Sequence, residues 1–515
     1  MKKYYITTAI PYANAAPHIG TAMDYLYGDI LLRYKLSQDF NAKLSIGTDE
    51  HGTKVEQKAR DNNMTPQEWT DQLQPEFQKM RAALNLDFGV SIDQIAKSLA
   101  EQDLTQQNII NVRTTDPTHV KNVQEIWRRL DRAGVIYKST YEGWYCVGCE
   151  GFVTETEARE MNYTCGDHNK PLEKLSEDNY YLKVSQFTEQ IREFAKTSVI
   201  PEFRGREILE LIKDGAKDVS ISRPVEKLKW GVPVPGDESQ IMYVWIDALS
   251  NYITALNYPD ASWQKDFWPA DVEIVGKDIL RFHAVIWPAM LLALGLDLPK
   301  KLMVHGFVNV GGSKMSKSIG NVVSPLEIIE QYGTDAFRYY FARHIPTFDD
   351  GDFTWEKLEN AYNGELANDL GNLVSRVANM LKKYEISAPN PEVIFNEFDR
   401  KSEQEVHEKI NQLFASYELN SALEFIWELV QNNNKFIEEK KPWTLAKTDR
   451  TSLENVLQKL WLNLVYLSEL LAPFLPETSA KIQNIFAKDS GEKITENLPI
   501  LFPKKYLHTE EPERK

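Results

Sequence analysis

Strand-like and helix-like segments alternate along the first 115 residues, and this alternation constrains the fold more than any other feature of the chain. Residues 4–9 are rich in aromatic and β-branched side chains, which favours a strand, and residues 42–46 form a second strand-like segment. A loop at 11–17 and a helix at 19–36 are expected between them. This order predicts a parallel sheet, with ligands bound at the carboxyl ends of its strands.

The alternation is interrupted near residue 116 and resumes near residue 232. The interruption combines a helix, short strands, three cysteines and a loop rich in Gly, Asp and Asn. Beyond it, strands are expected at 241–246, 272–275 and 302–310, a helix at 278–294, and long amphipathic helices such as 372–383 and 453–471. We therefore expect an α/β fold with a Rossmann-type parallel sheet, split by an insertion and followed by an all-α bundle.

Composition excludes several classes of protein. Hydrophobic residues make up 42% and charged residues 26% of the chain, which excludes a disordered or fibrous protein. The longest apolar run, at 284–296, contains Pro288 and is too short to span a bilayer, so no membrane association is expected. The first residues favour a strand over a signal peptide, which makes a cytoplasmic protein the expectation. A net charge of −16 excludes a uniformly basic coat for nucleic acid, while a local basic patch stays open.

Pro17-His18-Ile19-Gly20-Thr21 stands where the first strand turns into a helix. The first turn of a helix presents N–H groups and partial positive charge, which suits phosphates. The His18 imidazole can donate a hydrogen bond to a phosphate oxygen, and Gly20 lets a flat base approach the backbone. Taken alone, this short motif more often indicates only an ordinary loop.

Gly311-Gly312-Ser313-Lys314-Met315-Ser316-Lys317-Ser318 is the second candidate segment. Two lysines three positions apart follow a pair of glycines, which is typical of a mobile cationic loop. Such a loop can close over a triphosphate and neutralise the charge that develops at its α-phosphorus. A solvated basic loop is the alternative if the segment is considered alone.

Together the two segments resemble the paired signatures of class I aminoacyl-tRNA synthetases. Residues 314–318 match the second signature in full, whereas Thr21 stands where a second histidine is usual, which leaves that imidazole contact with ATP open. The resemblance implies catalytic roles for His18, Lys314 and Lys317, and ATP bound with Mg²⁺. The ATP-binding residues that it implies are His18, Gly20, Thr21, Gly276, Asp278, Lys314 and Lys317. Asp278 is expected to bind the ribose hydroxyls; without the resemblance it would be read as a helix N-cap.

Four further segments resemble methionyl-tRNA synthetases: AIPY at 9–12, GTDEHG at 47–52, YVWIDA at 243–248 and FHAVIWP at 282–288. Asp49 ends a strand, where a carboxylate can hold an ammonium group, and Trp245 is expected to end another. An aromatic-lined pocket suits a flexible thioether, because sulfur is attracted to aromatic rings by about 0.3–1.5 kcal/mol. By resemblance, Asp49 binds the α-amino group of methionine, and the pocket is lined by Ile10, Tyr12, Trp245, Tyr252, His283 and Trp287.

The three cysteines and one histidine have the spacing of a metal site. Cys146 and Cys149 are separated by two residues, and so are Cys165 and His168, fifteen residues further on. Thiolates and imidazole at this spacing suit one structural, tetrahedral Zn²⁺ with no open position. The insertion that carries them is too short for the large editing domain of the isoleucine, valine and leucine enzymes.

The helical region contains the candidates for tRNA recognition. Asn372 and Arg376 lie four residues apart, and Trp443 follows the basic pair Lys440-Lys441. A tryptophan can stack on an unpaired base for about 1–3 kcal/mol, while Asn and Arg read base edges. A buried Trp and an exposed helical pair are the alternative. By resemblance, these three residues bind the CAU anticodon of tRNA(Met), and a monomer is expected.

The predicted activity is that of a methionine–tRNA ligase, which makes methionyl-adenylate from methionine and ATP and transfers methionine to the terminal ribose of tRNA(Met). Another class I synthetase, such as the cysteine enzyme, is disfavoured because the zinc ligands lie in the insertion. A non-catalytic tRNA-binding paralogue stays open because of Thr21. Given the charge of −16, tRNA must meet a restricted basic face. The predicted regions are the sheet domain at 1–115 and 233–312, the zinc insertion at 116–232, a mobile loop and stem-contact region at 313–360, the anticodon-binding bundle at 361–505 and a tail at 506–515.

Overall fold

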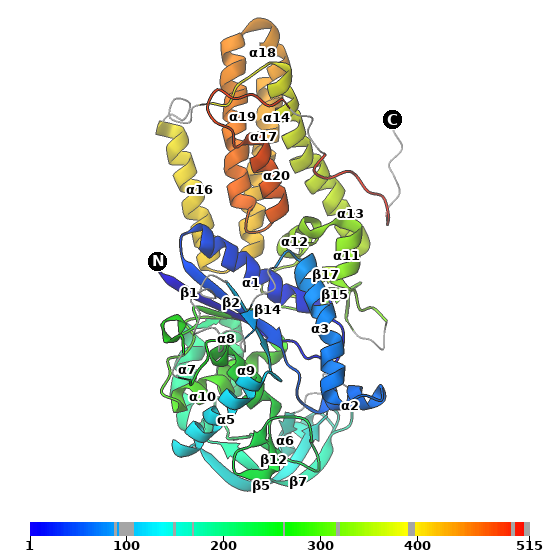
Figure 1. The fold of residues 1–515 in the computed structure, drawn as a ribbon, viewed down its shortest axis with the longest axis vertical. Helices are drawn as coiled ribbons and strands as arrows, with labels where there is room; N and C mark the ends of the chain where they lie inside the picture. Colours follow the sequence, from blue (N-terminus) through cyan, green and yellow to red (C-terminus); the bar gives the residue numbers. More distant parts are fainter. Residues whose placement is uncertain are drawn as a thin grey trace. The chain divides into compact units, whose positions relative to one another are not determined.

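The computed structural model divides the chain into two compact units, which we describe separately (Figure 1). Unit 1 comprises Met1–Ala16, Asp39–Lys79 and Asp87–Val304, and unit 2 comprises Pro17–Gln38, Met80–Leu86 and His305–Lys515. The described residues are 1–86, 90–91, 108–147, 151–166, 169–260, 263–315, 320–389, 397–495 and 500–508.

Unit 1 is built on a seven-stranded sheet with the order β3-β4-β2-β1-β13-β14-β8. Its strands are β1 (Lys3–Thr8), β2 (Asn41–Thr48), β3 (Val90–Ser91), β4 (Ile109–Arg113), β8 (Val199–Ile200), β13 (Val272–Gly276) and β14 (Leu302–His305). The pairings of β1 with β2 and β13, of β4 with β2 and β3, and of β14 with β8 are all parallel. The predicted parallel sheet is therefore confirmed.

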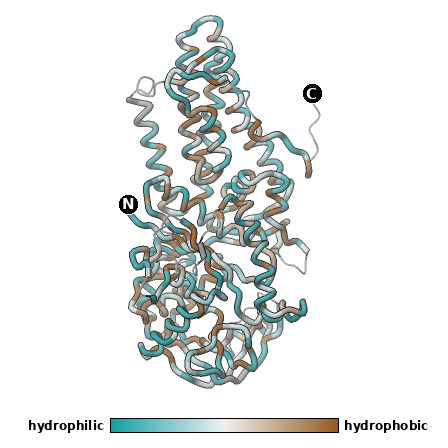
Figure 2. The backbone as a smooth tube through the Cα atoms, viewed as in Figure 1, coloured by the Kyte–Doolittle hydropathy of each residue, from teal (hydrophilic) through white to brown (hydrophobic). Residues whose placement is uncertain are grey.

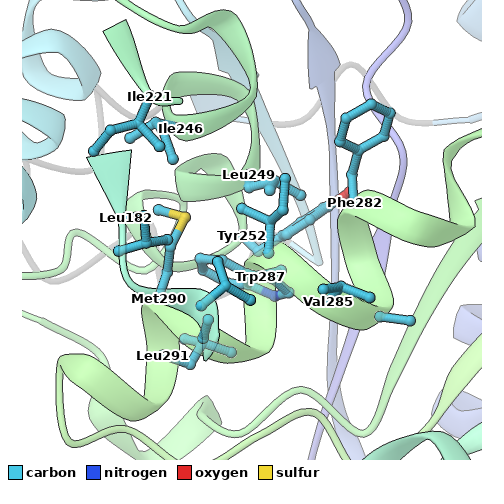
Figure 3. Packing of buried hydrophobic residues seen from close by; sticks show 14 of the residues in the cluster. Leu182, Ile221, Ile246, Leu249, Tyr252, Phe282, Val285, Trp287, Met290 and Leu291 are labelled. Carbon is cyan, nitrogen blue, oxygen red and sulfur yellow. The ribbon is translucent and has the colours of Figure 1, made fainter. Parts of the chain in front are cut away.

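One face of this sheet is covered by α9 (Val244–Thr254) and α10 (Trp287–Ala293). The Tyr5 hydroxyl on β1 donates to the carbonyl of Tyr252 on α9 at 2.9 Å, and Trp287 on α10 donates to Glu273 on β13 at 3.0 Å. Leu249, Met290 and Leu291 belong to the same buried cluster (Figure 3). Most side chains of both helices are buried, so the helices form the core on this face of the sheet.

Two strand predictions differ from the structure. The strand expected at 241–246 is the end of β12 (Asp237–Met242) followed by the start of α9, so Trp245 lies in the first turn of a helix. A short apolar run does not distinguish a buried strand from a buried helix. The strand expected at 302–310 is split into β14 and β15 (Val308–Val310) at Gly306. A Cβ atom at Gly306 would lie 2.2 Å from the carbonyl oxygen of Asp349, so glycine is required at this break.

The helix expected at 278–294 is also divided. The chain forms a 3-10 turn at Lys277–Ile279, a π-helical segment at Phe282–Ile286 and then α10. Pro288 lies within the first two positions of α10, where its missing N–H is tolerated. This subdivision sets the direction in which His283 and Trp287 leave the backbone.

The remaining strands of unit 1 form two small antiparallel sheets. The four-stranded sheet has the order β6-β5-β7-β9, with β5 (Ile136–Cys146), β6 (Gly151–Val153), β7 (Glu173–Leu182) and β9 (Val219–Ser220). The three-stranded sheet combines β12 with β10 (Ser222–Pro224) and β11 (Pro233–Val234). The helices of unit 1 are α2 (Thr53–Asp61), α3 (Pro66–Ala83, which extends into unit 2), α5 (Pro117–Arg132), α6 (Glu155–Glu160), α7 (Thr188–Thr197), α8 (Glu202–Leu211), α9 and α10.

Unit 2 contains α1 (Ile19–Ser37), a three-stranded sheet of order β16-β15-β17, and a helical bundle. Figure 2 shows hydrophilic and hydrophobic residues interspersed along the bundle helices, as expected of amphipathic packing. The short strands are β16 (Ser313–Lys314) and β17 (Gly351–Phe353). The helices after residue 320 are α11 (Pro325–Tyr332), α12 (Thr334–Arg343), α13 (Trp355–Ala361), a π-helical segment (Tyr362–Gly371), α14 (Asn372–Lys383), α16 (Glu397–Ala415), α17 (Leu419–Lys440), α18 (Pro442–Thr448), α19 (Arg450–Leu471) and α20 (Pro476–Phe486). The predicted helical C-terminal region is confirmed.

A buried ion pair organises unit 2. Arg338 on α12 is fully buried and lies 2.7 Å from Asp29 of α1. Its other N–H groups donate to the carbonyl oxygens of Leu84, Pro473 and Phe474 at 2.7–3.0 Å. With one carboxylate and three carbonyl partners, the buried guanidinium is well compensated.

Candidate functional site

His18 is the N-cap of α1 in unit 2. Its Nδ1 atom accepts a hydrogen bond from the backbone N–H of Thr21 at 3.3 Å. Since Nδ1 acts as an acceptor, a neutral imidazole carries its proton on Nε2. The imidazole thus lies at the N-terminus of α1, where backbone N–H groups and the helix dipole favour an anion such as phosphate.

The second candidate segment lies beside the first within unit 2. The N–H of Ile19 donates to the carbonyl oxygen of Val323 at 3.1 Å, and the terminal carbon of Met315 lies 3.4 Å from the position of a Cβ at Gly20. Lys314 is exposed on β16, with Nζ 4.6 Å from the centroid of the Phe307 ring. The structure thus brings together two segments that are far apart in the chain; Lys317 lies outside the described residues.

Gly20 is required by the His18 ring itself. A Cβ at this position would lie 2.9 Å from Cε1 and 3.0 Å from Nδ1 of His18. Because the sequence predicts that His18 contacts a phosphate, we expect Gly20→Ala, which must displace the imidazole, to lower kcat/KM for ATP at least tenfold. The measurement is ATP–pyrophosphate exchange, with thermal unfolding as the check on folding. Unchanged exchange would show that the imidazole position is unimportant.

The remaining nucleotide candidates, Gly276 and Asp278, belong to unit 1, at the carboxyl end of β13. Gly276 is the N-cap of the following 3-10 turn, and Asp278 is an exposed residue within that turn. The alternative in which Asp278 serves as the N-cap is therefore wrong. An exposed carboxylate at the end of a central strand can accept hydrogen bonds from sugar hydroxyls.

Asp49 and Tyr12 are neighbours at the carboxyl ends of β2 and β1. They form a parallel bridge in which the Asp49 N–H donates to the carbonyl of Pro11 at 2.9 Å. Asp49 is buried, with 4% of its surface exposed. Ile10 packs at Gly47, where a Cβ would lie 3.0 Å from the Ile10 side chain and 2.1 Å from the carbonyl oxygen of Val112. This edge of the sheet therefore holds a buried carboxylate beside an aromatic ring.

An aromatic group gathers on α9 and the π-helical segment. Trp245 stacks on Phe282 with ring centroids 3.9 Å apart, and the Tyr252 hydroxyl lies 2.7 Å from Nε2 of His283. Burial lowers the pKa of His283 to about 4, against the opposing effect of the hydrogen bond to Ile279. His283 is thus neutral at pH 7; Nδ1–H donates to the carbonyl of Ile279, so Nε2 accepts from Tyr252.

Trp287 completes this group. Its ring centroid lies 5.8 Å from that of Tyr252 and 6.1 Å from that of Trp268. Figure 3 shows Trp287 and Tyr252 within the buried cluster. Both Tyr12 and Trp245 pack against the buried cluster that contains Trp287. Four of the six predicted pocket residues therefore belong to this cluster or pack against it, and His283 contacts two of them, Tyr252 and Trp245.

Sequence reasoning missed a buried polar network that supports these residues. Nδ1 of His51 lies 2.7 Å from one oxygen of Asp247, and Nε2 of His119 lies 2.9 Å from the other. Although burial raises the pKa of Asp247, the two imidazoles lower it to about 2. His119 also contacts the hydroxyl of Thr254 at 2.7 Å, and the His51 ring meets Trp230 edge to face. The network links the segment after Asp49 to α9; His51 and Asp247 were both present in motifs noted for other residues.

The described half of the predicted metal site lies in the four-stranded sheet and the segment after α6. Cys146 ends β5, and Cys165 packs with it in a small cluster that also contains Ala158 and Leu172. Both thiols are buried and neither forms a disulfide. Cys149 and His168 lie outside the described residues, and no group of three metal-ligating side chains occurs among the residues that are described.

Two of the three predicted anticodon-binding residues contact each other in unit 2. The Arg376 guanidinium lies 6.0 Å from the centroid of the Trp443 ring and donates to Glu438 at 2.6 Å. Asn372 is exposed at the start of α14, one turn before Arg376. Trp443 has 40% of its surface exposed, so the alternative of a buried tryptophan is wrong.

No described helix has the length and apolar character needed to cross a bilayer.

Comparisons with known proteins agree over most of the chain. The family model of class I tRNA synthetases (M) matches residues 4–171 and 161–378, and that of the anticodon binding domain of methionyl tRNA ligase matches residues 390–501. The methionine–tRNA ligase of Clostridium acetobutylicum is 41% identical over 494 residues, covering 94% of this chain and 73% of the relative. The methionine–tRNA ligase of Brucella suis is 38% identical over 502 residues, which cover 96% of this chain and 93% of the relative.

Solved structures agree with these relatives. Mycobacterium tuberculosis methionyl-tRNA synthetase in complex with methionyl-adenylate superposes with a TM-score of 0.86 at 33% identity, covering 98% of this chain and 100% of that one. The apo form of the same enzyme gives a TM-score of 0.79 at 31% identity, and the match covers 98% of this chain and 99% of that one. In fold, in family and over nearly its whole length, this chain belongs to the methionine–tRNA ligases of the class I aminoacyl-tRNA synthetases.

Proposed function

We propose that unit 1 binds methionine between the Asp49 carboxylate and the aromatic group. Asp49 takes the α-amino group, and Ile10, Tyr12, Trp245, Tyr252, His283 and Trp287 surround the side chain. The observation that carries this assignment is the neutral His283, whose two nitrogens are both occupied by protein partners. A neutral, internally bonded imidazole leaves an uncharged wall, which suits an apolar thioether.

The reaction then proceeds in two steps. The methionine carboxylate attacks the α-phosphorus of ATP, forming methionyl-adenylate and releasing pyrophosphate. A ribose hydroxyl of the terminal adenosine of tRNA(Met) attacks the adenylate carbonyl, and AMP leaves. His18, Lys314 and Lys317 stabilise charge on the phosphates, with Gly20 and Thr21 at the helix N-terminus. Gly276 and Asp278 hold the ribose, and Mg²⁺ accompanies ATP as part of the substrate.

Two substitutions test whether the carboxylates of Asp49 and Asp278 bind different substrates. Asp49→Asn is expected to raise KM for methionine about tenfold or more, because an amide lacks the charge that attracts an ammonium group. Its KM for ATP should stay within about twofold. Asp278→Ala should show the reverse pattern. Both are measured by methionine-dependent ATP–pyrophosphate exchange. If both variants change the same KM, the assignment of separate subsites is wrong.

We also propose that Cys146, Cys149, Cys165 and His168 hold one structural Zn²⁺ in the insertion. Support comes from two buried thiols in one cluster, with only a few apolar residues around them. When bound, the ion stabilises a fold that its own core would not stabilise. Cys165→Ser is expected to reduce the zinc content from about one ion per chain to a small fraction and to lower the melting temperature, because hydroxyl is a poor zinc ligand. Metal analysis and calorimetry measure the two effects. Full zinc content in the variant would contradict the site.

For tRNA, we propose that Trp443 stacks on an anticodon base while Asn372 and Arg376 read base edges. The support is that Trp443 is exposed beside a guanidinium, which is the usual makeup of a single-strand platform. The partner is tRNA(Met), met by a localised basic face. A monomeric, cytoplasmic enzyme remains our expectation from the resemblance.

A further inference from the structure

Glu273 is a buried carboxyl group that the proposed mechanism does not use. It lies in the middle of β13, and none of its surface is exposed. Its Oε1 atom accepts a hydrogen bond from Nε1 of Trp287 at 3.0 Å. Its Oε2 atom has no hydrogen-bond partner within the described part of the chain. Burial of this carboxyl group costs desolvation free energy that an apolar side chain would not cost, so we expect the group to have a specific role.

Among the described residues, no cation is close enough to lower the pKa of Glu273. The titratable neighbour is Tyr5 on β1, whose hydroxyl donates to the carbonyl of Tyr252 and whose own pKa is raised by burial. Thr7 is the register partner of Glu273 on β1, so their side chains leave the sheet on the same face. Burial raises the pKa of Glu273 to about 8, which keeps it protonated at pH 7.

Trp287 has a single hydrogen-bonding group, and Glu273 occupies it. The indole is wholly buried between Tyr252 and Trp268. These tilted and edge-to-face ring contacts restrict the plane of the indole, whereas the N–H bond to Glu273 on β13 directs its N–H edge toward the sheet. The same ring contacts Tyr252, whose own ring lies 5.7 Å from that of His283, so the indole borders the predicted pocket residues. Figure 3 shows Trp287 beside Tyr252.

We propose that Glu273 is a positioning residue for methionine recognition: by accepting the indole N–H, it fixes the orientation of Trp287 as a wall of the methionine pocket. This inference rests on the proposed function, which places Trp287 in that pocket. The proposal also implies that an amide at position 273 serves equally well, because the amide oxygen can accept the same hydrogen bond from the indole N–H of Trp287.

The test compares Glu273→Gln with Glu273→Leu by ATP–pyrophosphate exchange. Glu273→Leu leaves the buried indole N–H without an acceptor, so KM for methionine is expected to rise roughly tenfold while kcat and KM for ATP stay within about twofold. Glu273→Gln is expected to keep all three parameters within about twofold. Thr7→Val, on the same face of the sheet, is the matched control and should change none of them.

Trp287 variants separate the inference from the proposed function. Trp287→Ala is expected to raise KM for methionine strongly; if it does not, the pocket assignment itself fails. Trp287→Phe removes the N–H but keeps an aromatic ring, so adding Glu273→Leu to it should have little further effect. If the effects of Trp287→Phe and Glu273→Leu on KM for methionine are additive, the positioning role is wrong. An unchanged KM for methionine in Glu273→Leu would also overturn it. If Glu273→Leu does not fold, Glu273→Met replaces it in both backgrounds, because methionine is close to glutamine in length and offers the indole N–H only a weak acceptor. It is expected to raise KM for methionine in the native background and to have little effect in the Trp287→Phe background; an unchanged KM in the native background would overturn the positioning role.

Discussion

Replacement of Lys314 by alanine is expected to lower the rate of methionine activation about a hundredfold while leaving the affinity for methionine within about twofold. Removing one preorganised charge or donor from a transition state typically costs a factor of 10²–10³. Lys314 is exposed on a short strand and its ammonium group rests against the Phe307 ring, so the fold does not depend on it. The loss should therefore appear in chemistry rather than in stability.

Pre-steady-state formation of methionyl-adenylate measures this effect, and equilibrium binding measures the affinity for methionine. Lys317→Ala is expected to behave in the same way, because the two lysines share the signature. Lys481→Ala on α20 removes an exposed lysine elsewhere in unit 2 and serves as the charge control. An activation rate within twofold of the native value in both signature variants would remove the loop from the mechanism.

Glu273→Gln is expected to stabilise the protein at alkaline pH by on the order of 5 kcal/mol relative to the native chain. Burial raises the pKa of Glu273 from 4.5 to about 8, although the hydrogen bond from Trp287 opposes the shift. Between those values the folded chain holds a proton that the unfolded chain has lost. The stability that Glu273 contributes is therefore present in full below about pH 4.5 and is lost as the pH rises through 8. Glutamine does not titrate, so its stability is unaffected.

Calorimetry between pH 5 and pH 9 checks this sign. The melting temperature of the Gln variant minus that of the native chain should increase steadily with pH and level off above about pH 8. A fixed offset, from the altered packing of an amide, does not affect this slope. The Thr7→Val variant should show a difference that does not vary with pH. A flat difference for Glu273→Gln would mean that the carboxyl is ionised in the fold throughout.

The local sequence pattern correctly predicted the helices and strands whose buried surroundings agree with that pattern. The helix expected at 19–36 is α1 (Ile19–Ser37), the strand at 272–275 is contained in β13, and the helix at 372–383 coincides with α14. The segment at 241–246 was misassigned because Val244, Trp245 and Ile246 have high β-propensity, while the packing of α9 against the sheet decides their conformation.

The candidate site divides in the same way. The positions of His18 and Asp49 at turns after strands could be predicted from the sequence, because a loop after a strand is a recognisable pattern; their roles stay predictions. Asp247 and Glu273 could not, because their importance depends on burial and on partners distant in the chain. An acidic residue in an apolar strand, as in Val272–Gly276, is the one signal that pointed to Glu273.

The Arg338 cluster has a consequence for biosynthesis. The ribosome makes α1 early, yet the partner of its buried Asp29 is encoded more than half the chain later, and the carbonyl groups of Pro473 and Phe474 emerge later still. Unit 2 is therefore a domain of high contact order that cannot complete its core during translation. During synthesis, Asp29 can pair within α1 with Arg33, whereas its ion pair with Arg338 forms only when the later helices have been made.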